Sequence, residues 1–217
     1  MKYILISLLI FSLSICDKLP NDIRWVVNSN EYEALCNQTY YMASLQLDKI
    51  LKKNRKNRNL AIVMDLDETV LDNSQYQVEN NKKNQTFNMD SWSDWVLREE
   101  AKLVPGVKKF INKIRKNNIQ LIFISNRMHK RLRATKNNMK KIGLHSKNDI
   151  YLLRKNKNDK KNIRRQEIYN SSGRMKEFKS FKVVQYFGDA MGDFPLLENN
   201  EFGKSQYILP NPMYGKW

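Results

Sequence analysis

The sequence lacks several features that would place it in a special structural class. Its two cysteines, Cys16 and Cys36, allow at most one bridge, which excludes a disulfide framework. It has no internal repeats, and its longest apolar stretch, over residues 3–15, is short for a transmembrane helix. A chain of 217 residues with 41% hydrophobic content is therefore expected to form one globular domain with a sizeable core.

Negative charge is also scarce. The chain has 22 Asp and Glu against 39 Lys and Arg, a formal net charge of +17. Such a balance can indicate binding to nucleic acid or to an anionic membrane. Here, however, lysine and asparagine are interleaved along the whole chain, as in "RKNKNDKKN" at 154–162, and no known nucleic-acid module is present. We therefore expect solvated basic surfaces, no specific nucleic-acid binding, and a general attraction for anionic substrates.

The N-terminus has the pattern of an export signal. Lys2 precedes the apolar stretch, and charged residues begin again at Asp17. "LSIC" at 13–16 resembles a bacterial lipobox, in which the cysteine becomes the lipidated first residue, although Ile15 stands where a small residue is usual. The sequence thus predicts a signal peptide over 1–15, lipidation at Cys16, and an exported, membrane-anchored protein on the outer membrane or another extracytoplasmic face. An ordinary secretory signal and an uncleaved anchor are the alternatives.

Helices and strands are expected to alternate after an irregular leader that ends at residue 29. Apolar residues recur on one helical face over 30–53, which places Cys36 in the core. Short runs rich in β-branched and aromatic residues indicate buried strands. The expected strands are 60–64, 119–124, 149–154, 181–187 and 206–210, and the expected helices are 104–118, 130–144 and 161–172. This order favours an α/β fold with an open, Rossmann-like parallel sheet flanked by helices.

Polar side chains follow three of these strands directly. They are Asp65 and Asp67, then Ser125, Asn126 and Arg127, then Asp189 and Asp193. Because ligands of open parallel sheets bind outside the carboxyl ends of the strands, we expect the three groups to meet. Clustered carboxylates without His or Cys suit a hard cation, most naturally Mg²⁺. Asp189 and Asp193, which are one helical turn apart, could instead be a helix cap and surface acids.

The motifs at these positions resemble those of the haloacid dehalogenase-like (HAD) phosphatases. "DLDET" at 65–69 is similar to their first motif, "FISNR" at 123–127 to their second and "FGDAMGDF" at 187–194 to their fourth. More narrowly, "DLDETVLDNSQY", "WSDWV", "VPGV" and the terminal "LPNPMYGKW" resemble the class C acid phosphatases, which are bacterial lipoproteins. The resemblance implies a leader and N-terminal helix at 16–59, a HAD-like catalytic core at 60–72 and 104–217, and a small, mostly helical cap inserted at 73–103.

The resemblance also implies an activity and residue roles. The chain would be a Mg²⁺-dependent phosphomonoesterase in which Asp65 attacks phosphorus to form an aspartyl phosphate, Asp67 is the general acid and then the base, and Ser125 binds a phosphoryl oxygen. The third motif resembles K-x-x-R-R, which "KNIRR" matches at Lys161, with neighbouring Lys160 as the alternative. The implied metal ligands are the Asp65 carboxylate, the Asp67 carbonyl, Asp189 and, directly or through water, Asp193.

The expected substrate is a nucleoside monophosphate, as for a 5′-nucleotidase, and other small phosphomonoesters are expected as secondary substrates. In the resembling family, aromatic residues of the cap and of the C-terminus stack on the substrate base, and Trp92 and Tyr214 stand at the matching places. Trp92 and Trp95 could instead pack the cap onto the core. Asn126 and Arg127 are expected to bind substrate, although Arg127 could equally form an orienting salt bridge, for example to an acid of the cap.

Two rival interpretations remain. The chain could be a surface lipoprotein that binds a ligand on a phosphatase scaffold, but the intact set of motif residues argues against this. It could also be a HAD phosphatase or phosphotransferase with a different substrate, which the motifs leave open, as they do homo-oligomerisation. Around the first motif, we expect Glu68 to point away from the site and to take no part in the chemistry. Asp72 and Asn73 are expected to fix the flap that leads to the cap.

Overall fold

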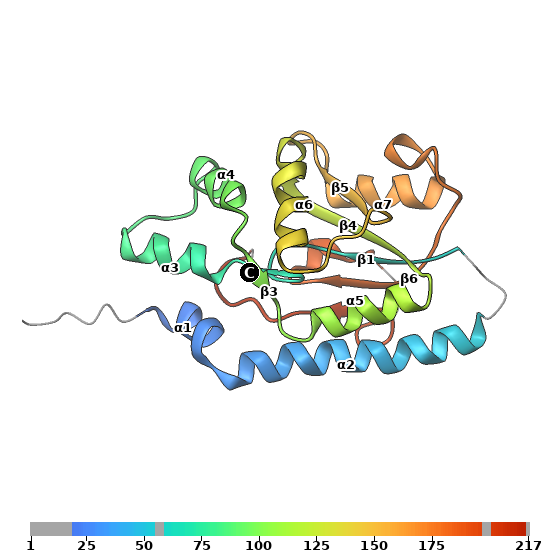
Figure 1. Cartoon of the computed structure of the whole chain (residues 1–217), viewed down its shortest axis with the longest axis horizontal. Helices are drawn as coiled ribbons and strands as arrows, with labels where there is room; N and C mark the ends of the chain where they lie inside the picture. The colour runs from blue at the N-terminus through green and yellow to red at the C-terminus, as the bar shows by residue number, and fades with distance from the viewer. Residues whose placement is uncertain (1–18, 55–58, 197–200, 216–217) are drawn as a thin grey trace, which may run out of the picture.

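The structure, a computed structural model, describes residues 19–54, 59–196 and 201–215 (Figure 1). The signal peptide predicted over 1–15 and the predicted lipidation site Cys16 lie outside these residues. Within the described ranges, none of the helices has the length and apolar character needed to cross a membrane. Cys36 is a free, buried cysteine, as expected from its place on the apolar face of its helix.

A five-stranded, all-parallel sheet lies at the centre of the molecule, with the strand order β5-β4-β1-β6-β7. The strands are β1 (Leu60–Met64), β4 (Gln120–Met128), β5 (Ile150–Arg154), β6 (Lys182–Gly188) and β7 (Gln206–Ile208). All five residues of the central strand β1 are buried, which explains its unbroken apolar sequence. The α/β fold with a Rossmann-like parallel sheet is thereby confirmed.

Helices cover both faces of the sheet. Ile62 and Met64 belong to one hydrophobic cluster, whereas Ala61 and Val63 belong to the other, because successive side chains of a strand point to opposite faces. The first cluster takes in α2 (Asn30–Lys53), α5 (Val107–Lys116) and α6 (Leu132–Lys141), and the second takes in α7 (Lys161–Asn170) and η2 (Gly173–Met175). Figure 1 shows α2 running along the lower side of the molecule beneath α5.

The leader is not irregular throughout, as the sequence had suggested. Residues 21–28 form helix α1 (Asn21–Asn28), which buries Ile23 and Val26 and contacts α2 and α3. Ser29 then ends α1 and caps α2, since its Oγ accepts the backbone N–H of Tyr32 at 3.1 Å. The expectation failed because the burial of one apolar face of eight residues, which depends on tertiary packing, stabilises a helix too short to be stable alone.

The segment predicted to be the cap, which keeps that name below, contains two helices between a pair of short antiparallel strands. Strand β2 (Leu71–Asp72) leads into α3 (Ser74–Lys82) and α4 (Met89–Arg98), and β3 (Lys102–Leu103) returns the chain to the core. Asn88 caps α4, since its Oδ1 accepts the backbone N–H groups of Asp90 and Ser91. Figure 1 shows both helices at one end of the sheet, next to α1 and α6.

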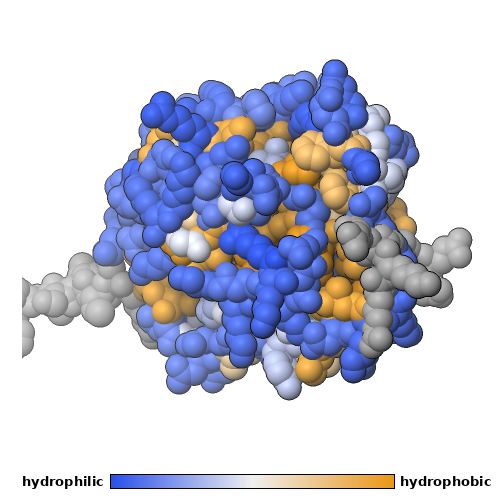
Figure 2. All heavy atoms as spheres, turned by 45° about the vertical axis from the view of Figure 1, so that its right-hand side comes forward, coloured by the Kyte–Doolittle hydropathy of each residue, from blue (hydrophilic) through white to orange (hydrophobic). Residues whose placement is uncertain are grey.

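The surface is mainly hydrophilic, in keeping with the abundance of Lys and Asn. On the face shown in Figure 2, hydrophilic residues cover most of the surface, and hydrophobic residues show in several separate areas between them.

Candidate active site

Three carboxylates meet where the central strands β1 and β6 end. Asp65 follows β1, and Asp189 and Asp193 follow β6, with Asp193 in the short helix η3 (Met191–Asp193). One oxygen from each of the three lies within 4.8 Å of the others. The backbone N–H of Asp65 donates to the carbonyl of Phe187 at 2.9 Å, which fixes the two strand ends relative to each other. The convergence predicted from the sequence is therefore present at this edge of the sheet.

Gly188 allows Asp193 to fold back over the end of β6. A Cβ atom at position 188 would lie only 2.3 Å from the Asp193 side chain, so no larger residue fits there without displacing the carboxylate. The backbone N–H of Ala190 donates to Asp193 Oδ2 at 3.0 Å and holds it in this place. Gly188, the first glycine of "GDAMGD", is thus required because the side chain of Asp193, a candidate metal ligand, approaches it closely.

Lys161 supplies the positive charge among these acids. It is the first residue of α7, and its Nζ lies 2.7 Å from Asp65 Oδ1 and also contacts Asp193 Oδ1. The neighbouring Lys160, the N-cap residue of the same helix, is exposed. Of the two alternatives left open by the sequence, the structure therefore favours Lys161.

The pKa values of these side chains reflect burial and the short distances between their charges. Burial raises the pKa of Asp65 well above its ordinary value; Lys161 opposes the shift, and Asp193 and Asp189 reinforce it. Burial and the charge of Asp193 raise the pKa of Asp189 to about 6. Burial lowers the pKa of Lys161, but the carboxylates of Asp65 and Asp193 outweigh burial and raise it above its ordinary value. One lysine does not balance three acids, two of which are buried and one half-buried.

The acidic cluster fits a hard divalent cation. Asp65 Oδ1 is buried and ion-paired with Lys161, but within the described parts of the chain it accepts no hydrogen bond of regular geometry. All the available ligand atoms are carboxylate or carbonyl oxygens, which are the ligands that Mg²⁺, Mn²⁺ and Ca²⁺ prefer. A cation bound there would give Asp65 Oδ1 a second positive partner besides Lys161 and offset the repulsion that raises the acid pKa values.

Asp67 lies beside the cluster and is held by the end of β4. Its Oδ1 accepts hydrogen bonds from Arg127 Nε at 2.9 Å and from Asn73 Nδ2 at 3.0 Å, and its Oδ2 accepts one from Ser125 Oγ at 3.3 Å. Arg127 is buried, so it forms the orienting salt bridge that was one of its two predicted roles, but to Asp67 of the core and not to an acid of the cap. Its contact with substrate stays a prediction.

Arg164, for which no role was expected, positions the second motif. It is fully buried, and its guanidinium donates to the Ser125 carbonyl at 2.6 Å and to Asn126 Oδ1 at 2.7 Å. Since a guanidinium can only donate, the exposed Asn126 amide must turn its oxygen towards Arg164 and its N–H groups away. The sequence feature that could have indicated this role is the position of Arg164 in "KNIRR". It lies about one helical turn after Lys161, on the buried face of α7.

Two further residues depart from the predictions. Glu68, in the first motif, differs from the expected position, and no role was predicted for Asn211, in the C-terminal motif. Glu68 is buried in a turn with φ +54° and accepts the backbone N–H of Asn73 at 2.9 Å, which corrects the expectation that it points away. Strand alternation failed there because the chain leaves β1 in a tight turn. Asn211, within the C-terminal motif, donates from Nδ2 to Asp189 Oδ2 at 2.8 Å.

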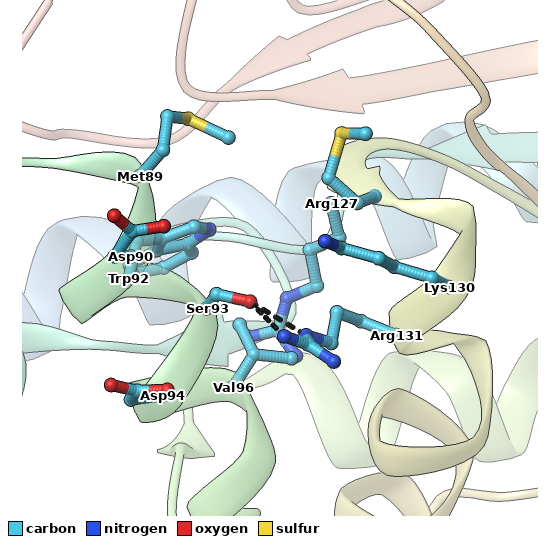
Figure 3. Close-up of a pocket in the computed structure, with 10 residues that line it drawn as sticks. Met89, Asp90, Trp92, Ser93, Asp94, Val96, Arg127, Lys130 and Arg131 are labelled. Carbon is cyan, nitrogen blue, oxygen red and sulfur yellow. Dashed lines mark hydrogen bonds between the residues drawn. The ribbon is translucent and has the colours of Figure 1, made fainter.

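A cavity of about 180 Å³ opens between α4 and the segment after β4. Figure 3 shows Trp92 and Asp90 on one wall, Lys130 on the other, and Arg127 between them. Arg131, in the short helix η1 (His129–Arg131), joins the walls by donating from Nε to Ser93 Oγ at 2.7 Å.

Trp92 and Tyr214, the two residues predicted to stack on the substrate base, have different surroundings. Trp92 lines this cavity, and its ring also contacts Tyr76 and Phe87 of the cap. Tyr214 is 38% exposed. Stacking of substrate on these two rings stays a prediction.

Comparisons with known proteins agree with the resemblance seen in the motifs. A family model described as HAD superfamily, subfamily IIIB (acid phosphatase) matches residues 11–217. Two structures of the class C acid phosphatase from Bacillus anthracis, one with tungstate bound, are 30% identical to this chain with a TM-score of 0.77, covering 89% of this chain and 84% of theirs.

More distant relatives come from Glycine max. A stem 31 kDa glycoprotein is 26% identical over 161 residues, and a stem 28 kDa glycoprotein is 28% identical over 153 residues. These matches cover 72% and 70% of this chain but 59% and 58% of the glycoproteins, so the chain spans about three fifths of the length of these curated relatives.

Proposed function

Because this chain belongs to subfamily IIIB of the HAD superfamily, the acid phosphatase subfamily, we propose that it hydrolyses small phosphomonoesters through an aspartyl phosphate at Asp65. The observation that carries the proposal is the meeting of Asp65, Asp67 and Lys161 with the acids Asp189 and Asp193 at the end of the two central strands. All five are intact, which argues against a scaffold that only binds a ligand.

In the first step Asp65 attacks phosphorus, the bond from phosphorus to the leaving oxygen breaks, and that oxygen takes a proton from Asp67. In the second step water attacks the aspartyl phosphate, gives a proton to Asp67, and releases inorganic phosphate while the Asp65 carboxylate is restored. Covalent capture divides one difficult displacement into two easier ones, and one group serves as acid and then as base.

The remaining groups lower the charge repulsion between a carboxylate nucleophile and an anionic substrate. Lys161, 2.7 Å from Asp65 Oδ1, would offset phosphoryl charge, and Ser125 and the amide N–H groups of Asn126 would donate to phosphoryl oxygens when the substrate is bound. A Mg²⁺ ion held by the Asp65 and Asp189 carboxylates, the Asp67 carbonyl and, directly or through water, Asp193 would supply further positive charge there. The tungstate complex of the Bacillus anthracis relative supports a site for tetrahedral oxyanions, so tungstate is a suitable inhibitor to test.

The direct test is an assay of the purified chain on p-nitrophenyl phosphate, AMP and nicotinamide mononucleotide, with Mg²⁺ and with EDTA. We expect release of inorganic phosphate from all three substrates in the presence of Mg²⁺ and competitive inhibition by tungstate. A chain that binds these compounds without turning any of them over would be a binding protein on a phosphatase scaffold.

We propose nucleoside monophosphates as the preferred substrates because the aromatic ring of Trp92 lines the cavity next to Arg127. Replacing Trp92 by alanine should raise the KM for AMP about tenfold, since stacking of a base on an aromatic ring contributes roughly 1–3 kcal/mol. The KM for a small alkyl phosphate should stay the same, and Trp92→Phe should retain most of the affinity for AMP. Equal changes for both substrates would show that Trp92 only packs the cap.

We also propose that the chain is exported and anchored to a membrane through lipidated Cys16. The wild-type protein should partition into the detergent phase of Triton X-114, and Cys16→Ala should move it to the aqueous phase. Wild type in the aqueous phase would indicate an ordinary secretory signal. A Cys16→Ala variant that stays in detergent would indicate an uncleaved anchor.

A further inference from the structure

Asn73, which the proposed mechanism does not use, lies where the catalytic core and the cap meet. It is fully buried, and its side-chain amide makes four hydrogen bonds. Nδ2 donates to Asp67 Oδ1 at 3.0 Å and to the Leu71 carbonyl at 3.1 Å. Oδ1 accepts from Trp95 Nε1 at 2.9 Å and from Arg127 at 3.1 Å. Both donors and both lone pairs of the amide are therefore occupied.

The partners of Asn73 leave its amide only one orientation. An indole N–H and a guanidinium can only donate, so the atom that faces Trp95 and Arg127 must be the oxygen. The amide nitrogen is then forced towards Asp67, where it donates to a carboxylate. The Leu71 carbonyl, which can only accept, favours the same orientation, and removal of the Trp95 N–H would take away one of the two contacts that hold the amide oxygen.

The same contacts distinguish the two oxygens of Asp67. Oδ1 accepts from Asn73 and from Arg127 Nε and lies 2.8 Å from a terminal guanidinium nitrogen of Arg127. Among the residues that the structure describes, Oδ2 has a single hydrogen-bond partner, Ser125 Oγ at 3.3 Å. Oδ1 is thus occupied by donors, and Oδ2 is the oxygen left to carry a proton towards a leaving group.

We propose that Asn73 is a positioning residue that presents Asp67 Oδ2 to the leaving group, and that Trp95 makes this position depend on the placement of cap helix α4. The inference rests on the proposed function, because it needs Asp67 to act as the general acid. Trp95 is buried on α4, and Trp92, three residues earlier on the same helix, lines the cavity beside Arg127. The helix that borders the space for the leaving group therefore also holds the residue that orients the acid.

Two substrates separate this role from a purely structural one. Nitrophenolate is a stable anion that departs with little help from an acid, whereas an alkoxide needs a proton as it leaves. The ratio kcat/KM covers the steps up to transfer of the phosphoryl group to Asp65, in which Asp67 is the acid. Misplacement of Asp67 should therefore lower kcat/KM for an alkyl phosphate far more than for p-nitrophenyl phosphate, while a loss of folded protein lowers both equally.

The experiment compares Asn73→Ala and Trp95→Phe with wild type on glycerol 2-phosphate and p-nitrophenyl phosphate. We expect kcat/KM for the alkyl ester to fall by on the order of 100-fold in Asn73→Ala and about tenfold in Trp95→Phe, against less than about threefold for the aryl ester. Trp25→Phe, which removes an indole N–H on α1, is the matched control and should change neither. Thermal unfolding is measured for each variant.

The outcomes are distinguishable. If Asn73→Ala lowers both substrates by the same factor, Asn73 does not position the acid. If the ratio between substrates changes in Asn73→Ala but not in Trp95→Phe, the acid is positioned without the cap. Trp95→Phe keeps the aromatic volume, so it still tests the inference if Asn73→Ala fails to fold: an unchanged ratio overturns the coupling. An inactive wild-type chain, in contrast, would contradict the proposed function itself.

Discussion

Asp65→Asn is expected to lower kcat on p-nitrophenyl phosphate by on the order of 10⁴-fold or more, because it removes the nucleophile while keeping its shape. The amide cannot form the aspartyl phosphate, and the other groups of the site cannot replace that step. The folded state should survive, because burial and the neighbouring acids already raise the pKa of Asp65 well above its ordinary value, so a neutral side chain is tolerated there. The measurement is steady-state turnover, together with the unfolding temperature of the variant.

The control for this variant is Asp48→Asn. Asp48 is an exposed acid on α2 that pairs with Lys113 at 2.7 Å, and such a surface ion pair contributes little to stability. Its replacement makes the same chemical change far from the site and should leave turnover unchanged. Activity of Asp65→Asn close to that of wild type would contradict the assignment of Asp65 as the nucleophile.

Removal of divalent cations is expected to have the second-largest effect. EDTA should lower turnover by more than about 100-fold, and Mg²⁺ should restore it, because one lysine does not offset three clustered acids and an anionic substrate. The ion should also stabilise the folded protein, by about 2.7 kcal/mol when its concentration is 100 times its Kd, since it binds only the folded state. For a chain of this size that corresponds to a rise of roughly 5–10 °C in the unfolding temperature.

This stabilisation should depend on pH. The pKa of Asp189 is raised to about 6 in the metal-free protein, above its value in the unfolded chain, so its ionisation destabilises the fold as the pH rises from about 4 to 6. Bound Mg²⁺ removes that penalty, and the gain from Mg²⁺ should therefore be larger at pH 7 than at pH 5. Asp189→Asn should lose the Mg²⁺-dependent shift, and Asp48→Asn should keep it. An equal shift in Asp189→Asn would place the ion elsewhere.

The fold and the location of the site could both be predicted from the order of apolar and polar segments along the chain. Five apolar runs alternating with helical patterns can bury their surface only as a covered parallel sheet, and in such a sheet the residues that follow the strands meet at one edge. Asp65, Asp189 and Ser125 could therefore be assigned to one site, although more than a hundred residues separate the first from the second. Their polar character after apolar runs was a sufficient signal.

Which side chains contact each other at that edge could not be predicted from the sequence and depends on how the helices and strands pack together. The choice of Lys161 over Lys160 depends on how α7 is rotated against the sheet, and "RKNKNDKK" carries no periodicity that sets this rotation. Glu68 lies in a turn and Asn73 lies just before the first residue of α3, so strand alternation holds for neither. The pairing of Arg127 with Asp67, and the contact of Trp95 with Asn73, join segments from β4, the first motif and the cap. Such contacts depend on the packing of separate elements, because local sequence patterns specify which face of an element is buried but not which polar groups will meet on it.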